Sequence, residues 1–274
     1  MPGGVMTGGI MTGGIMTGRH LLILGGTGEA AALARGALAR FGDMMAVTTA
    51  LAGRTRHPGP IAGTVRIGGF GGAVGLASYV IDHGVDRLVD ATHPFAAAIS
   101  RSARLGAESA GVPRLLLLRP PWRRDPLDRW IEVDSFDAAA TLVGRVGRRA
   151  WLTVGTGAVP AFTRAIDVRF VVRLIDPPRH PLPLPLHELV LGRGPFSVAG
   201  ERHLLQRHAI DVVVCKASGG AATEAKLIAA RELGLPVIMV RRPMPEPGDA
   251  VDTVEAALDW LAGLDRLALA QRMS

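Results

Sequence analysis

The sequence predicts an α/β protein with two Rossmann-like lobes, whose mainly parallel sheets face a central cleft. Short apolar strands alternate with longer helical segments from residue 20 onward, and glycine-rich turns follow several of these strands. A proline-rich stretch at residues 120–126 interrupts this alternation near the middle of the chain. The length of 274 residues suits two modest domains, and 48% hydrophobic residues can supply their cores.

The first lobe is expected at residues 19–122, after a low-complexity leader at residues 1–18 that we expect to be disordered. Its apolar runs are typical of buried strands, and its Ala- and Leu-rich stretches favour helices. The expected strands are Leu21–Leu24, Met44–Thr49, Val65–Ile67, Arg87–Asp90 and Arg114–Arg119. The expected helices are Glu29–Arg40, Val74–His83 and Phe95–Ala110. Right-handed crossovers between them give a doubly wound sheet.

The second lobe is expected at residues 123–274, where the same alternation resumes after the proline-rich linker. The expected strands are Trp130–Val133, Ala150–Val154, Phe170–Leu174, Glu188–Leu191, Val212–Cys215 and Val237–Val240. The expected helices are Phe136–Val143, Val159–Ala165, Ala199–His208, Ala221–Leu233 and Val254–Leu264.

Composition restricts the classes of partner. A net charge of +7 favours anionic ligands, but aromatic residues make up only 4% and no nucleic-acid-binding module is present. Phosphates or polycarboxylates therefore fit better than nucleic acid. No apolar run is long enough to span a membrane. The lone Cys215 excludes a disulfide framework and fits a cytoplasmic protein, and the scattered histidines predict no metal site.

The loop Gly25-Gly26-Thr27-Gly28 lies between the first expected strand and the first expected helix. Glycines there let a phosphate approach the backbone, and the helix N-terminus supplies free N–H groups. The full dinucleotide-binding glycine pattern is absent, so the loop alone is compatible with a glycine-rich turn that only places Glu29 in the first turn of the helix.

The end of the second strand distinguishes between nicotinamide cofactors. NAD-binding proteins usually place an acidic residue there, whereas Thr49, Arg54 and Arg56 here provide a hydroxyl and two guanidinium groups. These groups favour the 2′-phosphate of NADP. Two solvated loop arginines are the alternative.

The junction Asp90-Ala91-Thr92-His93-Pro94-Phe95 places an acid, a hydroxyl and an imidazole at the end of an expected strand, where parallel α/β folds bind ligands. Pro94 is expected to be the first residue of a helix that Thr92 or His93 caps. The alternative is a capped turn in which Asp90 and Thr92 only satisfy backbone donors.

Strand-end loops of the second lobe carry further candidates. Lys216, Ser218 and Gly219 follow an apolar strand, so Lys216 is a possible proton donor or carboxylate anchor, while Ser218 is equally suited to cap a helix. Arg193 lies in another such loop and provides a guanidinium group for an anion.

Together these loops resemble the precorrin-6A reductase family of corrin biosynthesis, in its cobalt-free or cobalt-containing branch. The matching blocks keep the family's order from about residue 20 to 243. They are Leu24–Glu29, Leu51–Thr55, Gly68–Gly72, Asp90–Phe95, Arg119–Trp122, Arg193–Phe196 and Lys216–Gly220. Ala217 and Gly157 depart from the family's usual residues at their positions.

The resemblance implies an NADPH-dependent reduction of one macrocycle double bond, which converts precorrin-6A to precorrin-6B. The cofactor contacts it implies are Gly25, Gly26, Thr27, Gly28, Thr49, Arg54, Arg56, Gly68, Gly69, Phe70 and Thr92, with Gly68, Gly69 and Phe70 beside the nicotinamide. The implied contacts to substrate carboxylates are Arg119, Arg123, Arg124, Arg193, Lys216, Ser218 and Gly219. Asp90, His93 and Lys216 are the candidate catalytic residues.

Several alternatives stay open on the sequence. The proton that accompanies the hydride comes either from one of these side chains or from solvent. The macrocycle either contains cobalt or lacks it. A non-catalytic NADP-binding sensor would explain the phosphate loops but leaves Lys216 and Arg193 without a role. The oligomeric state is also open.

Overall fold

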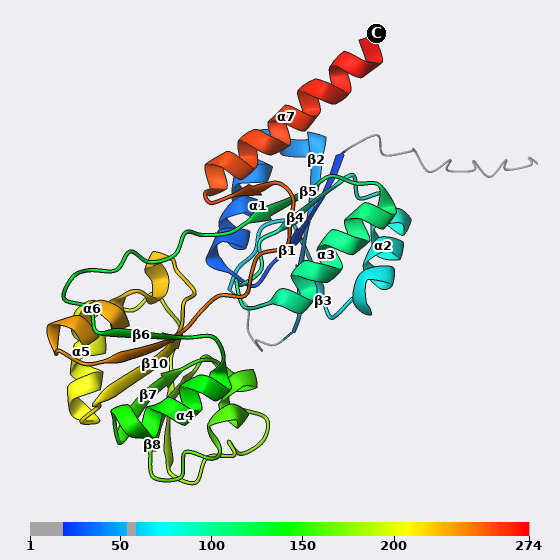
Figure 1. Ribbon diagram of the computed structural model, residues 1–274. Coiled ribbons are helices and arrows are strands. Elements are labelled where there is room, and N and C mark those ends of the chain that lie inside the picture. Colours follow the sequence, from blue (N-terminus) through cyan, green and yellow to red (C-terminus); the bar gives the residue numbers. More distant parts are fainter. Residues whose placement is uncertain (1–18, 54–58, 274) are drawn as a thin grey trace, which may run out of the picture.

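The computed structural model describes residues 19–53 and 59–273, and the described chain forms two six-stranded sheets (Figure 1). Every strand pair in both sheets is parallel, which confirms the predicted two-lobe α/β fold. The leader at residues 1–18 and the positions of Arg54 and Arg56 lie outside the described residues.

The first sheet has helices on both faces. Its strands are β1 (Arg19–Leu24), β2 (Met45–Leu51), β3 (Thr64–Ile67), β4 (Arg87–Asp90), β5 (Arg114–Leu117) and β12 (Ala250–Val251). Its helices are α1 (Gly28–Phe41), the short η1 (Gly42–Met44), α2 (Gly72–Asp82), α3 (Ala97–Ala110) and α7 (Val254–Met273). Apolar residues of α1 and α7 form the core on one face, and those of α2 and α3 form it on the other.

The second sheet is built in the same way. Its strands are β6 (Trp130–Val133), β7 (Arg149–Thr153), β8 (Arg169–Leu174), β9 (His187–Leu191), β10 (Val212–Lys216) and β11 (Val237–Val240). Its helices are α4 (Phe136–Val146), α5 (Val198–Arg207) and α6 (Ala225–Glu232), with the 3₁₀ helices η2 (Thr156–Phe162) and η3 (Ala221–Thr223). The helix expected at Val159–Ala165 is thus a 3₁₀ helix, because Pro160 removes a backbone donor.

The two sheets share one strand order and exchange their sixth strands. The orders are β3-β2-β1-β4-β5-β12 and β9-β8-β7-β10-β11-β6. The strand that follows β5 in the chain joins the second sheet, and the strand that follows β11 joins the first. The chain therefore crosses between the lobes twice, at residues 118–129 and 241–249.

This exchange changes the assignment of the C-terminal segment. The sequence placed all residues after 122 in the second lobe, but β12 pairs with β5 and α7 packs against α1. β12 is only two residues long, which is too short for an apolar pattern to reveal. The last turns of α7 extend away from the first sheet (Figure 1).

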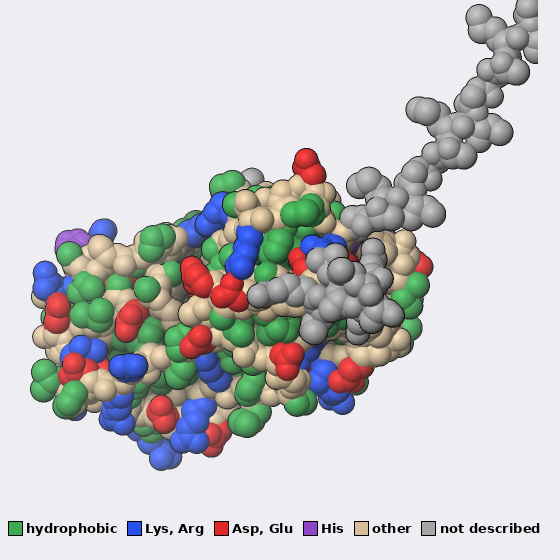
Figure 2. All heavy atoms as spheres, turned by 90° about the horizontal axis from the view of Figure 1, so that it is seen from above, with side chains coloured by type: hydrophobic (Ala, Val, Ile, Leu, Met, Phe, Trp, Pro, Cys, Tyr) green, Lys and Arg blue, Asp and Glu red, His purple; other side chains and the backbone are tan. Residues whose placement is uncertain are grey.

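The surface shows why net charge alone is a weak guide to partners. On the face seen in Figure 2, Lys and Arg side chains are interspersed with Asp and Glu, without a continuous basic surface. In the described part of the chain, no helix is long and apolar enough to cross a bilayer.

A buried ion pair attaches α7 to the first lobe. Arg87 at the start of β4 is 5% exposed, and its Nη1 donates to Asp265 Oδ1 of α7 at 2.6 Å. Its Nε also donates to the half-exposed Asp86 at 2.7 Å. Asp265 also pairs with Arg19. Loss of the Asp265 charge therefore removes a buried partner from both arginines and leaves the buried Arg87 with only the half-exposed Asp86.

We predict that Asp265→Asn lowers the free energy of unfolding by about 3 kcal/mol, as expected when a buried pair loses one charge. Asp259→Asn is the matched control. Asp259 lies on the same helix as Asp265, but its partner is Arg40 of α1 and their ion pair is exposed. That change should cost less than about 1 kcal/mol. Urea unfolding of both variants checks this, and equal small losses would show that Arg87 does not depend on Asp265.

Candidate active site

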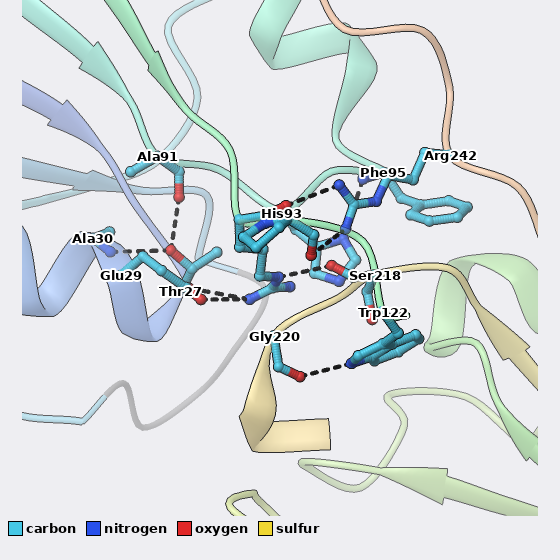
Figure 3. A network of polar contacts seen from close by, with 12 residues as sticks. Thr27, Glu29, Ala30, Ala91, His93, Phe95, Trp122, Ser218, Gly220 and Arg242 are labelled. Carbon is cyan, nitrogen blue, oxygen red and sulfur yellow. Dashed lines mark hydrogen bonds and ion pairs between the residues drawn. The ribbon is translucent and has the colours of Figure 1, made fainter. Parts of the chain in front are cut away.

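The glycine-rich loop after β1 joins the carboxyl ends of three neighbouring strands. Gly25 N donates to Ala50 O of β2 at 2.9 Å, and the Thr27 hydroxyl donates to Ala91 O after β4 at 2.7 Å. Thr27 also caps α1, because its Oγ1 accepts from Ala30 N at 3.1 Å (Figure 3). The loop is therefore held in place by strands on both sides.

This loop has open space where a phosphate can approach. A Cβ added at Gly26 or Gly28 would meet no atom within 4 Å, and the φ of +103° at Gly26 favours glycine. The first turn of α1 also presents N–H groups that no helical carbonyl accepts. The residues present thus fit a pyrophosphate.

Thr49 does not belong to this open surface. Its side chain is fully buried, and its Cγ2 lies 2.7 Å from the position of a Cβ on Gly25. The buried side chain of Thr49 packs against Gly25 in the loop. The structure therefore does not support the predicted contact between Thr49 and a phosphate.

The Gly68–Phe70 loop after β3 is organised by Arg66, which sequence reasoning missed. Arg66 donates to Gly68 O at 2.6 Å and to Gly69 O at 2.9 Å, and its Cζ lies 4.0 Å from the Phe70 ring centroid. The sheet order places β3 and β4 on opposite sides of β1. The Gly68–Phe70 loop and the loop after β4 therefore lie at opposite ends of the first-lobe site.

The Asp90–Phe95 junction forms a turn and not the start of a helix. The Asp90 carboxylate is fully buried, and its Oδ1 accepts from Thr92 N at 3.1 Å and from Thr92 Oγ1 at 2.7 Å. Phe95 N donates to His93 Nδ1 at 3.2 Å. α3 begins at Ala97 without a side-chain cap, so the predicted start at Pro94 is wrong.

The reason is local competition for hydrogen bonds, since Thr92 and His93 are already occupied within the turn. Asp90 Oδ1 holds Thr92 in place. Its Oδ2 is buried without a partner among the described residues.

His93 is an electrically neutral imidazole at this site. Burial, followed by the charges of Lys216, Arg119, Arg242 and Lys226, lowers the pKa of His93 to about 3. Because Nδ1 accepts from Phe95 N, the proton of the neutral ring lies on Nε2. His93 therefore offers a hydrogen-bond donor and is not charged near neutral pH.

The loop after β10 is covered by the first chain crossing. A Cβ on Gly219 would lie 2.1 Å from Pro120 O, and one on Gly220 would lie 2.8 Å from Arg119 Cδ. Ser218 and Gly219 are buried, so the structure does not support their predicted contacts with substrate carboxylates. Their small size serves close packing between the crossing and the loop.

Two arginines, Arg119 and Arg242, hold this junction together, and Figure 3 labels Arg242 beside Ser218. Arg119 Nε donates to Ser218 O at 2.8 Å, and Arg119 Nη1 pairs with Glu29 of α1 at 3.1 Å. Arg242, in the second crossing, donates to Ala217 O at 2.7 Å, Arg119 O at 2.9 Å and Pro120 O at 3.1 Å. The sequence signal for Arg242 was its position two residues after the end of an apolar strand.

The predicted substrate residues are only partly brought together. Lys216 Nζ lies 5.5 Å from the Phe95 ring centroid. Its positive charge also contributes to the lowered pKa of His93. Arg193 follows β9, the edge strand three positions from β10, and Arg123 is exposed on the first crossing. The structure assembles His93, Lys216, Arg119 and Arg242. The loop that carries Arg193 packs against the segment after the β10 loop, since a Cβ on Gly194 would lie 3.0 Å from Ala222 O.

Comparison with known proteins gives the family. The family model described as precorrin-6x reductase CbiJ/CobK matches residues 20–262, which span both lobes and the returning strand β12. The chain belongs to the precorrin-6x reductase family. The resemblance seen in the sequence motifs is thereby confirmed, and the protein is an oxidoreductase.

The relatives cover between 70% and 90% of this chain. A precorrin-6A reductase from Rhodococcus erythropolis is 49% identical over 90% of this chain and 98% of its own. A solved structure of the CobK precorrin-6A reductase matches with a TM-score of 0.85 at 42% identity, covering 89% of this chain and 96% of that chain. A cobalt-precorrin-6A reductase from Priestia megaterium is 30% identical over 70% of this chain and 78% of its own.

For this family member we predict that the His93 ring stays neutral down to about pH 4.5. Because the folded pKa is lowered to about 3, the unfolded chain binds a proton near pH 6.5 that the folded protein does not bind. His93 therefore makes the folded state less stable as pH falls below 6.5. Ring chemical shifts measured by NMR check this, and a titration midpoint between pH 6 and 7 would refute it.

Proposed function

We propose that this chain reduces one double bond of precorrin-6A to give precorrin-6B in cobalamin biosynthesis, with NADPH as the hydride donor. One observation supports this proposal most strongly. The open glycine-rich loop at the start of α1 lies next to a cluster of cationic side chains at the interface between the lobes. The identity to a precorrin-6A reductase, 49% against 30% for a cobalt-precorrin-6A reductase, favours the cobalt-free macrocycle as substrate.

NADPH would supply the hydride, and the first lobe has the groups to hold it. Gly26, Gly28 and the first turn of α1 would bind the pyrophosphate. Arg54 and Arg56, which lie outside the described residues, remain our candidates for the 2′-phosphate on sequence grounds. The sheet order favours the Gly68–Phe70 loop for the adenosine half, which revises its expected place beside the nicotinamide.

The macrocycle carries several acetate and propionate carboxylates, which require cations in its binding site. Lys216 lies near His93, and the desolvated Arg242 adds positive charge there, while the charge of Arg119 is paired with Glu29. Carboxylates that enter this partly buried site are bound more strongly than at the open surface, because the local dielectric is low. We assign Lys216 to a substrate carboxylate.

The proton that accompanies the hydride is best assigned to solvent. The pKa of about 3 makes His93 a neutral donor with no acidic proton to give near neutral pH. The Asp90 carboxylate is buried and bonded to Thr92. His93 Nε2–H would instead orient the macrocycle, while the two lobes exclude bulk water from the path of the hydride.

Mixing the protein with NADPH and precorrin-6A tests the proposal. Turnover should consume the near-ultraviolet absorbance of NADPH and shift the macrocycle spectrum, with NADH much less effective. Parallel reactions with cobalt-precorrin-6A decide between the two branches. If NADPH binds but the spectrum of neither macrocycle changes, the result would favour a non-catalytic NADPH sensor and would refute the proposed reductase activity.

We predict that Lys216→Met raises the KM for the macrocycle about 10-fold or more and leaves the Kd for NADPH within about 2-fold, since a charge-assisted hydrogen bond contributes about 1.5–3 kcal/mol. Steady-state kinetics and NADPH fluorescence measure the two quantities. A large loss of NADPH affinity would assign Lys216 to the cofactor instead.

A further inference from the structure

Arg173 is a buried arginine of β8 in the second lobe. Its side chain is 10% exposed, and it pairs with Glu201 of α5, whose side chain is 2% exposed. Its Cζ lies 4.6 Å from the ring centroid of the fully buried Trp151. Apolar side chains of similar volume would often make the lobe at least as stable as a buried ion pair does. The pair therefore indicates a role other than stability.

The guanidinium group of Arg173 also contacts the ring of Phe196, which lies at the end of the loop after β9. Arg173 Cζ lies 3.8 Å from the Phe196 ring centroid, so the cation lies directly against the ring. Glu201 accepts a hydrogen bond from Arg173 Nη2 and thereby limits the rotation of the guanidinium group. The position of the Phe196 ring is thus tied to β8 and to α5.

The backbone at residues 192–194 runs along the edge of this ring. A Cβ on Gly192 would lie 3.3 Å from Phe196 Cε1, and one on Gly194 would lie 3.4 Å from Phe196 Cε2. Arg193 lies between the two glycines and is exposed. The Phe196 ring therefore determines the course of the backbone that carries Arg193.

The loop after β9 and the loop after β10 lie at the same edge of the second sheet. Both follow the carboxyl ends of strands in an all-parallel sheet. A Cβ on Gly194 would lie 3.0 Å from Ala222 O in η3, which directly follows the β10 loop. The fold therefore places two cationic residues, Arg193 and Lys216, on loops at one sheet edge.

We propose that Arg173, held by Glu201, is a positioning residue that fixes the Phe196 ring and thereby presents Arg193 to a carboxylate of the macrocycle. Arg173 acts through the loop after β9 and touches no ligand itself. Arg193 then binds one carboxylate while Lys216 binds another. This inference rests on the proposed function, because it needs the polycarboxylate macrocycle as substrate.

The first test removes both members of the ion pair, because loss of Arg173 alone would leave the buried Glu201 carboxylate uncompensated. Lys226 loses two opposing influences in the double variant Arg173→Met/Glu201→Leu, since Glu201 raises the pKa of Lys226 and Arg173 lowers it. We expect a thermal midpoint close to that of the wild type. The Kd for precorrin-6A, measured from the macrocycle absorbance without NADPH, should rise about 10-fold, because Arg193 is no longer held toward the carboxylate.

Kinetics separate positioning from a general loss of structure. In the double variant the KM for precorrin-6A should also rise about 10-fold, while kcat and the Kd for NADPH stay within about 2-fold of the wild type, since the lost contact binds the ground state and the transition state alike. The matched control is Arg202→Gln/Glu232→Gln, which removes an exposed ion pair between α5 and α6. It should change none of these quantities.

A comparison with Arg193→Met shows whether Arg173 acts through Arg193. On its own, Arg193→Met should raise the Kd for precorrin-6A about 10-fold. Adding Arg173→Met/Glu201→Leu to it should raise this Kd by less than about 2-fold more, because both changes remove the same contact. If the two effects multiply instead, Arg173 does not act through Arg193 and the inference is wrong.

The proposed function and the positioning role fail in different ways. If the wild-type protein neither binds nor reduces precorrin-6A, the proposed function itself is wrong. If the wild type does both, a folded Arg173→Met/Glu201→Leu variant with an unchanged Kd for precorrin-6A would overturn the positioning role. Should that variant not fold, Phe196→Leu tests the same contact with the ion pair intact. It should raise this Kd about 10-fold, and an unchanged value would overturn the inference.

Discussion

The double crossing of the chain is the constraint on which the rest of this structure depends. The sixth strand of each sheet comes from a distant part of the chain: β12 joins the first sheet and β6 joins the second. The first lobe is therefore not a continuous segment of the chain. Arg242 in the second crossing is bonded to the carbonyls of the first crossing and of the loop after β10. Because all strands are parallel, their carboxyl-end loops lie at one edge of each sheet, and the crossings bring the two edges together.

The electrostatics of the site follow from this arrangement. Lys216, Arg119, Arg242 and Lys226 are brought near His93 from the second lobe and from both crossings, and burial lowers the pKa of Lys226 and of Arg242. Burial and these positive charges keep the imidazole neutral. In the function that we propose, the site would hold and orient a polyanionic substrate, and the cofactor would supply the chemistry.

The regular elements were predictable because the sheets are parallel and their strands are buried on both faces. Short apolar runs such as Val212–Cys215 therefore stood out, and the loops that follow them were correctly expected at the sheet edge. Contacts between distant residues were not predictable. The tertiary structure alone determines which residues Glu29, Arg66 and Arg242 contact. A glycine-rich loop such as the one at Gly219 also looks the same in sequence whether it binds a phosphate or packs against a chain crossing. The exchange of β12 was missed because a two-residue strand leaves no periodic signal.

A crystal structure of the complex with NADP⁺ and the macrocycle tests the central claim most directly, since that claim concerns where the two ligands meet. The account predicts the pyrophosphate at Gly26 and Gly28, the nicotinamide at the β4 side of β1 next to His93, and a macrocycle carboxylate on Lys216. A nicotinamide at the Gly68–Phe70 end, or a macrocycle bound away from the interface between the lobes, would contradict it.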